Sequence, residues 1–490
     1  MKSFDNKLYL KLQSENIQKR ISEFDKLYLE IGGKLFDDHH AKRVLRGFEL
    51  TSKINVLSKF KNDLEVLIVI NANDIDTVKI RGDINISYED DVLLLVEKFK
   101  NIDFSVNGVV ITHYANQYAV DVFKKKLNNL GINVYMHYPI AGYPHNTSLI
   151  LSPDGFGKNE YIKTTKKLII VTAPGPGSGK MATCLSQLYQ DNTRGVVSGY
   201  AKYETFPVWN LPLKHPVNLA YEAATADLED VNMIDYYHKE KYGVDAVNYN
   251  RDLEAFPVLK QIFERIYGES PYYSPTDMGV NMVGFGIVND EAAIESSKQE
   301  VIRRYLDTLV SLKKGTATQR AVDKIVSVMS ELGLSVADRR CVQAALDQEL
   351  KKKVPCSAIE LSSRKIFLGK ESDLLTSAAA AVINALKSLA HIPDDIPLLS
   401  HPIIEPIQML KKDCLHRSSS RLDLEEVLIA LSITATTNAT SQKALSCLPK
   451  LKNAQLHSTV ILYQDEIKVL KSLGIDCTME PIQRKFYLGK

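Results

Sequence analysis

Short apolar runs separated by amphipathic segments stand out in the first third of the chain. The runs have the length of buried strands and cover residues 65–70, 108–112, 132–136 and 168–172. Between them, residues 90–99 and 120–130 carry apolar side chains at the spacing of one helix face. Apolar strands that alternate with amphipathic helices are typical of a parallel sheet covered on both faces. The pattern predicts a doubly wound, mostly parallel, Rossmann-like α/β domain with its ligand site at the carboxyl ends of the strands.

The rest of the chain changes character twice. Residues 195–290 are rich in proline, tyrosine and asparagine, and predict long polar loops that still belong to the first domain. Three helices are expected next, with breaks at Gly315 and Gly333. The predicted organisation is an α/β domain over 1–290, a helical subdomain over 291–353 and a C-terminal α/β domain over 354–490.

The C-terminal domain has its own order of elements. A hairpin is expected over 358–361 and 365–368, an alanine-rich helix over 374–390, and a strand, helix and strand over 458–462, 466–473 and 476–479. The segment 364–370 also recurs as 484–490, which we interpret as two similar strand ends. This order resembles the opening of the cytidine-deaminase-like fold. The helix begins Thr376-Ser-Ala-Ala instead of with a zinc ligand and Ala-Glu, so the resemblance implies a degenerate domain that serves as a scaffold or assembly surface.

Composition and charge exclude several classes of protein. The 490 residues include 61 basic and 59 acidic ones, so the net charge of +2 gives no general attraction to nucleic acid or membranes. No segment has the length and hydrophobicity of a transmembrane helix, and the N-terminus does not have the pattern of a signal peptide. The six cysteines form no CxxC pair. We therefore expect a cytoplasmic protein with reduced thiols that binds neither nucleic acid nor membranes.

The segment after the strand at 168–172 has the parts of an anion-binding loop. It reads Ala173-Pro-Gly-Pro-Gly-Ser-Gly-Lys-Met-Ala-Thr183 and leads into a predicted helix. Glycines allow successive N–H groups to converge on one anion, and the start of a helix adds its positive dipole end. The candidate ligands of a phosphate group are Gly175, Gly177, Ser178, Gly179, Lys180 and Thr183.

The loop departs from the nucleotide-binding pattern G-x-x-x-x-G-K-[ST] at two positions. Pro174 stands where the first glycine belongs and Met181 stands where Ser or Thr belongs, while Pro176 removes a further N–H group. These departures favour phosphate binding over ATP hydrolysis. The alternative is a turn rich in glycine and proline that merely joins a strand to a helix.

Further candidate residues follow predicted strands or lie on the polar loops. Asp37 and Asp74 are the candidate metal ligands, with Mg²⁺ as the expected ion. His215, Asp277 and Asn281 are the candidate catalytic residues, because neighbouring proline or glycine would fix them rigidly. The alternative for these residues is a structural one, in which the side chains bond to nearby backbone.

Long phrases in the chain resemble a widespread family of bacterial proteins of similar length that has no assigned activity. The phrases are Leu29-Glu-Ile-Gly-Gly-Lys-Leu-Phe-Asp-Asp-His-His-Ala, Val171-Thr-Ala-Pro-Gly-Pro-Gly-Ser-Gly-Lys-Met-Ala-Thr, Trp209-Asn-Leu-Pro-Leu-Lys-His-Pro-Val-Asn and Ser274-Pro-Thr-Asp-Met-Gly-Val-Asn-Met. The resemblance implies a cytoplasmic three-part protein and makes Pro174 and Met181 family features. It supplies no reaction.

The leading hypothesis is an ATP-dependent phosphotransferase or ligase, with ATP or another nucleotide and Mg²⁺ bound at the loop over 173–183. One alternative is an enzyme that acts on a phosphorylated small molecule without ATP. Another is a non-enzymatic nucleotide sensor or assembly protein. A homo-oligomer is expected in each case.

Overall fold

A computed structural model describes residues 2–81, 86–228 and 230–483. The chain divides into two compact units. The N-terminal unit comprises residues 1–222 and 230–297, and the C-terminal unit comprises residues 223–229 and 298–490. Within the described ranges, no helix is both long enough and apolar enough to cross a membrane.

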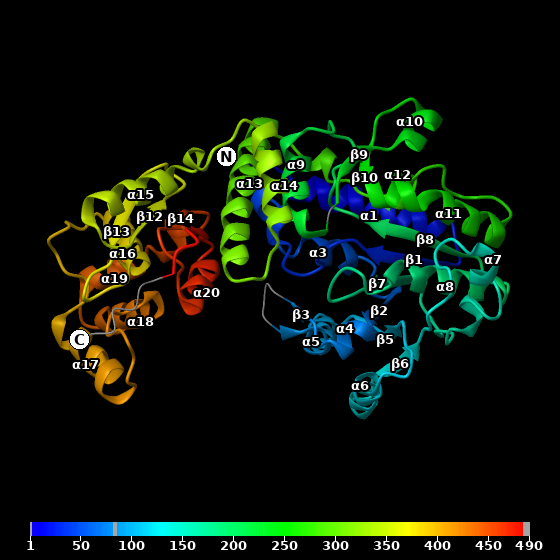
Figure 1. The fold of residues 1–490 in the computed structure, drawn as a ribbon, viewed down its shortest axis with the longest axis horizontal. Coiled ribbons are helices and arrows are strands. Elements are labelled where there is room, and N and C mark those ends of the chain that lie inside the picture. Colours follow the sequence, from blue (N-terminus) through cyan, green and yellow to red (C-terminus); the bar gives the residue numbers. More distant parts are fainter. Residues whose placement is uncertain (1, 82–85, 229, 484–490) are drawn as a thin grey trace. The chain divides into compact units, whose positions relative to one another are not determined.

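A parallel seven-stranded sheet forms the centre of the N-terminal unit, in the order β11-β8-β1-β7-β2-β5-β6. Strands from distant parts of the sequence, blue to green in Figure 1, lie side by side in it. The four predicted strands are confirmed within a few residues. The strand bounds are β1 (Lys26–Ile31), β2 (Leu64–Asn71), β5 (Ser105–Thr112), β6 (Asn133–Met136), β7 (Leu168–Thr172), β8 (Ser198–Tyr203) and β11 (Gly279–Val280).

Helices cover this sheet, and short strand pairs lie outside it. The strand pairs are β3 (Ile80–Arg81) with β4 (Ile86–Ser87), and β9 (Asn232–Ile234) with β10 (Val247–Tyr249). The helices are α1 (Asn6–Ser22), α2 (His39–Val44), α3 (Ser52–Ser58), α4 (Ala72–Asp76), α5 (Tyr88–Asn101), α6 (Tyr118–Asn129), α7 (Thr147–Ile150), α8 (Lys180–Asn192), α9 (Pro216–Ala224), α10 (Tyr236–Tyr242), α11 (Asn250–Tyr267) and α12 (Pro275–Met278). The sequence predicted α5 and α6 at nearly these positions.

One face of the sheet is covered by α8 and α11. Side chains of both helices share a buried core with Tyr28, Leu67, Val69, Val110, Ile169 and Tyr200 from the strands. Because side chains alternate between the two faces of a strand, the residue two positions after each of these points to the same face. Glu30, Asn71, Thr112 and Lys202 therefore lie at the carboxyl edge on the α8 and α11 side.

The prediction that residues 195–290 are mainly irregular is wrong. The segment contains the internal strand β8, the edge strand β11 and the helices α9 to α12. Helix α11 has 18 residues. Apolar side chains in α11 follow a helical spacing at Leu253, Phe256, Leu259 and Phe263, and Pro257 within the helix hides that pattern. β8 has no apolar run, because Ser198, Gly199 and Lys202 leave only short apolar stretches between them.

The C-terminal unit contains a four-stranded sheet in the order β13-β12-β14-β15. The predicted hairpin and alanine-rich helix are confirmed, but the next strand lies at Gln455–Ser458 instead of 458–462. That strand reads Gln-Leu-His-Ser, and its polar residues His457 and Ser458 are fully buried. A search for apolar runs therefore does not find it. The repeated segment 484–490 lies outside the described residues. The elements are α13 (Asp290–Lys313), which continues from the N-terminal unit, α14 (Gln319–Glu331), α15 (Arg340–Lys352), β12 (Cys356–Glu360), β13 (Ile366–Lys370), α16 (Ser377–Leu389), α17 (His401–Met409), α18 (Leu424–Thr434), α19 (Ala439–Leu445), β14 (Gln455–Ser458), α20 (Gln464–Ser472) and β15 (Asp476–Met479).

Replacing Gly369 by alanine is expected to lower the free energy of unfolding of the C-terminal unit by ~1–3 kcal/mol. An added Cβ would lie 2.2 Å from the backbone nitrogen of Ala381 and 2.3 Å from the carbonyl oxygen of Ser377, so α16 would have to move. Urea unfolding measures the change. Lys370→Ala, at the next and exposed position, is the control. An unchanged unfolding midpoint for Gly369→Ala would contradict the close packing of α16 on β13.

Candidate functional site

A glycine-rich turn joins β7 to α8 at the carboxyl edge of the sheet. Gly177 and Gly179 have φ angles of +76° and +91°, which side chains other than glycine rarely adopt. At Gly175 the restriction is the available space, because a Cβ there would lie 2.2 Å from the hydroxyl oxygen of the buried Tyr88. The glycines thus have steric reasons to occur at these positions.

Polar side chains from β2 and β5 hold the carbonyl groups of the turn. Asn71 Nδ2 donates to the carbonyl oxygen of Gly177 at 3.1 Å, and Thr112 Oγ1 donates to that of Ser178 at 2.7 Å. In a trans peptide the N–H points opposite to the C=O. The N–H groups of Ser178 and Gly179 therefore point away from β2 and β5.

Among the described residues, the turn and the start of α8 contain several backbone N–H groups without a protein acceptor. Within the part of the chain that the structure describes, the N–H groups of Gly175 and of residues 177–182 donate to no protein acceptor. The first backbone bond of α8 is donated by Thr183 to the carbonyl oxygen of Gly179. A helix start with unused N–H groups and a positive dipole end suits an anion.

The side chains of the turn differ in what they offer a ligand. Among the described residues, Glu30 is the one carboxylate within 4 Å of the Lys180 ammonium, with Lys180 Nζ 3.9 Å from Glu30 Oε1. The Thr183 hydroxyl is buried and donates to the carbonyl oxygen of Gly179 at 3.0 Å, and the Ser178 hydroxyl donates to that of Gly175 at 3.2 Å. The turn therefore presents a cation and N–H groups, while both hydroxyls already serve the backbone.

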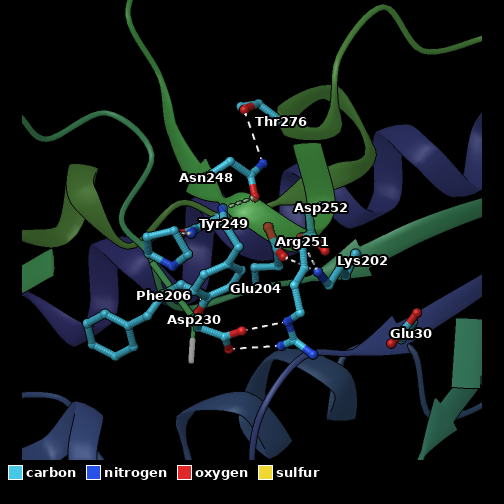
Figure 2. A network of polar contacts seen from close by, with 12 residues as sticks. Glu30, Lys202, Glu204, Phe206, Asp230, Asn248, Tyr249, Arg251, Asp252 and Thr276 are labelled. Carbon is cyan, nitrogen blue, oxygen red and sulfur yellow. Dashed lines mark hydrogen bonds and ion pairs between the residues drawn. The ribbon is translucent and has the colours of Figure 1, made fainter. Parts of the chain in front are cut away.

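A buried network of charges lies beside the turn at the carboxyl ends of β1 and β8 (Figure 2). Lys202 Nζ lies 2.8 Å from Glu204 Oε1 and 2.5 Å from Asp252 Oδ2, in the first turn of α11. Glu30 Oε2 accepts a hydrogen bond of 2.8 Å from the Tyr200 hydroxyl. The exposed fractions of the charged side chains are 9% for Glu30 and Glu204, 14% for Lys202 and 18% for Asp252.

Burial and charge set the protonation of this network. Burial alone would lower the pKa of Lys202, but Asp252, Glu204 and Glu30 outweigh it and raise that pKa well above its ordinary value. Lys202 is therefore fixed as an ammonium group. The pKa of Glu204 is raised, because burial disfavours its charged form more than Lys202 stabilises it. Burial and the neighbouring Glu30 raise the pKa of the Tyr200 hydroxyl, which stays a donor.

The predicted catalytic residues lie in separate local networks. His215 Nε2 is 3.0 Å from Asp290 Oδ1, and His215 Nδ1 accepts from a backbone N–H. Asp277 lies 3.6 Å from His238 Nδ1 and accepts from the Tyr242 hydroxyl at 3.1 Å, and hydrogen bonds of this kind overcome the effect of burial and lower its pKa.

Asn281 has a structural environment. Its Nδ2 donates to the carbonyl oxygen of Pro207 at 2.9 Å, and its Oδ1 accepts from the N–H of Val283 at 3.2 Å. The Trp209 indole donates to its backbone carbonyl at 2.9 Å. In the described ranges, no hydrogen bond or ion pair connects His215, Asp277 or Asn281 to Lys180 or Glu30.

The predicted metal ligands also lie apart. Asp37 Oδ2 is 3.1 Å from Lys98 Nζ, and Asp74 Oδ1 is 3.0 Å from Lys79 Nζ. Among the residues that the structure describes, no three or more His, Cys, Asp or Glu side chains are grouped so that they hold a metal ion. A role of either aspartate in binding Mg²⁺ stays a prediction.

Comparison with known proteins covers nearly the whole chain. The profile described as domain of unknown function DUF1846, N-terminal, matches residues 2–333, and that described as domain of unknown function DUF1846, C-terminal, matches residues 337–487. The chain belongs to the DUF1846 family. This DUF1846 protein is 53% identical over 481 residues to the UPF0371 protein SpyM50764 of Streptococcus pyogenes serotype M5, with 98% of this chain and 97% of the relative covered. It is 52% identical, with the same coverage, to the UPF0371 protein SUB1165 of Streptococcus uberis. The resemblance to a bacterial family of this length is confirmed.

Sequence reasoning missed the charged network of this DUF1846 protein. Glu30 lies inside one of the phrases that carry the family resemblance, but the phrase does not indicate that it joins this network. Lys202 and Glu204 stand two positions apart at the end of β8, so their side chains lie on the same face. This spacing would have indicated a charged pair if a strand at 198–203 had been predicted. Asp252 has no comparable signal, because only the fold places α11 beside β8.

Proposed function

We propose that this DUF1846 protein binds a phosphorylated small molecule, with the phosphate group on the N–H groups of residues 177–182 and on Lys180. One observation carries the proposal. The carbonyl groups of the turn are held by Asn71 and Thr112, while in the described part of the chain the N–H groups of residues 177–182 have no protein acceptor. Unused donors at a helix start, beside a lysine, favour a multiply charged oxyanion.

Binding without ATP hydrolysis is the alternative that the geometry favours. A nucleotide-hydrolysing loop commonly places a Ser or Thr hydroxyl on Mg²⁺ directly after its lysine. Here Met181 occupies that position, and the Thr183 hydroxyl is engaged with the backbone of Gly179. We therefore propose a phosphorylated substrate or effector, and retain an ATP-dependent phosphotransferase or ligase as the competing function.

Calorimetry with Lys180→Ala tests the phosphate site. Losing the charge-assisted bonds of Lys180 is expected to weaken the binding of inorganic phosphate and of phosphate esters by ~10- to 100-fold, because such bonds contribute ~1.5–3 kcal/mol. Lys167→Ala is the matched control, since Lys167 is exposed and precedes β7 at the opposite edge of the sheet. Equal affinities for wild type and Lys180→Ala would remove the turn from the proposal.

Titrations of ATP, ADP and GTP with and without Mg²⁺ separate the alternatives. ATP binding that needs Mg²⁺ and is followed by release of phosphate would favour the phosphotransferase or ligase. ATP binding without turnover would favour a nucleotide sensor. Binding of phosphate esters without any preference for ATP is the outcome we expect.

A second proposal concerns the C-terminal unit, which we propose to be a degenerate cytidine-deaminase-like domain. The hairpin β12–β13 is followed directly by α16, which packs on both strands, and this order supports the resemblance. Thr376 caps α16, and its hydroxyl donates to Glu466 at 2.5 Å. The first residues of α16 are Ser377-Ala-Ala-Ala, with no His or Cys to bind zinc, which is consistent with a scaffold.

A further inference from the structure

We infer that Glu30 accepts a hydrogen bond from a hydroxyl group of the phosphorylated ligand, so that the ligand is a sugar phosphate or another polyol phosphate. This inference rests on the proposed phosphate site at Lys180. It adds a chemical class of ligand, which the turn alone does not specify.

Among the residues that the structure describes, one oxygen atom of Glu30 receives no hydrogen bond. The side chain is 9% exposed, and its Oε2 accepts from the Tyr200 hydroxyl at 2.8 Å. Its Oε1 lies 3.9 Å from Lys180 Nζ, which is too far for a hydrogen bond. Within the described residues neither Oε1 nor Lys180 Nζ makes a hydrogen bond, so an unused acceptor and an unused donor lie next to each other at the turn.

The neighbouring cations do not complete the coordination of Glu30. Lys202 is bound by Glu204 and Asp252, and Arg251 forms a two-point ion pair with Asp230 at 2.5 and 2.8 Å. Figure 2 shows Glu30 to the side of both groups, without a line to any residue drawn. Both cations are thus engaged by other carboxylates, which leaves Glu30 Oε1 open to a ligand beside Lys180.

The charges then restrict the ligand. A phosphate beside Lys180 also lies near the Glu30 carboxylate, and two anions so close repel each other in a partly buried place. A hydroxyl group near the phosphate offsets this repulsion, because it donates a charge-assisted hydrogen bond to Oε1. A phosphate ester without hydroxyl groups lacks this compensation and should bind more weakly.

Calorimetry with paired phosphate esters tests the inference on the full-length protein. The probes are methyl phosphate, which has no hydroxyl group on its carbon, and ribose 5-phosphate, which has several. We expect wild type to bind ribose 5-phosphate at least tenfold more tightly than methyl phosphate. Glu30→Gln should reduce this preference to threefold or less, and should leave methyl phosphate binding unchanged or tighter because a negative charge is lost.

Further variants separate this inference from the proposed phosphate site. Lys180→Ala should weaken the binding of both esters alike, and Glu30→Asp, which keeps the charge but shortens the side chain, should give an intermediate preference. Equal binding of the two esters by wild type would overturn the inference and leave the phosphate site in place. If neither ester nor inorganic phosphate binds, both proposals fall. Binding of Mg²⁺ alone that is lost in Glu30→Gln would also overturn the inference, in favour of a cation site.

Discussion

Replacing Lys202 by methionine is expected to destabilise the N-terminal unit by ~3–5 kcal/mol, because removing one member of a buried ion pair leaves its partners uncompensated. The variant would leave Glu204 and Asp252 without the ammonium group that lies 2.8 and 2.5 Å from them. Urea unfolding at neutral pH, followed by the fluorescence of Trp209, measures the loss. Trp209 is the only tryptophan of the chain and belongs to this unit.

Two further variants make the Lys202 result specific. Lys260→Met, at an exposed position of α11, should leave the unfolding midpoint unchanged. Combining Lys202→Met with Glu204→Gln and Asp252→Asn should recover much of the lost stability, because the two carboxylates that contact Lys202 are then replaced by neutral amides. A Lys202→Met protein as stable as wild type would show that the three groups are not coupled as the structure places them.

The stability of the N-terminal unit is expected to fall by about 3 kcal/mol through His137 as the pH decreases from 6.5 to 4. His137 follows β6 and is buried, and its Nε2 has no hydrogen-bond partner among the described residues. Burial lowers its pKa from 6.5 to about 4. In this pH range the unfolded chain binds a proton that the folded unit excludes, so acid favours unfolding. Above pH 6.5 this contribution to stability is fully present.

Comparison with His137→Gln isolates that contribution. Unfolding by urea is measured for wild type and the variant at several pH values between 4 and 8. The difference in unfolding free energy between the two proteins should shrink as the pH falls, since only wild type carries the buried imidazole. Parallel curves would contradict a depressed pKa for His137. Tyr118→Phe, at an exposed position of α6, should give a curve parallel to that of wild type.

The sequence predicted the strands that are buried on both faces and little of how they pair. β2, β5 and β7 read as apolar runs because helices cover both sides of the sheet, and α5 and α6 show a clear helical spacing. The position of β7 between β1 and β2 depends on contacts between distant residues, which local hydrophobicity does not encode. β8 was not predicted, because the charged Lys202 near its end interrupts the apolar pattern. Lys202 forms its ion pairs with Glu204 and Asp252, which only the fold brings together.

Of the candidate site, the sequence predicted the glycine-rich turn but not the charged network beside it. The turn has a local signature, since its glycines, its lysine and the flanking strand and helix are consecutive in sequence. Glu30, Lys202 and Asp252 meet only in space, so no spacing along the chain reveals them together. His215 and Asn281 lie outside helices and strands, next to α9 and β11. The bonds of Asn281 hold backbone groups, whereas His215 contacts both Asp290 and a backbone N–H.

The order of strands in the sheet has a consequence for how the protein is made. β1 is completed early in synthesis, but its two neighbours are β7 and β8, and Leu27 pairs with Leu168 while Lys26 pairs with Ser198. At ~5–20 residues per second, the ribosome needs on the order of 10–30 s to produce the first of these partners. During that time β1 lacks both of its partners, and unpaired strand edges of this kind can pair with other chains.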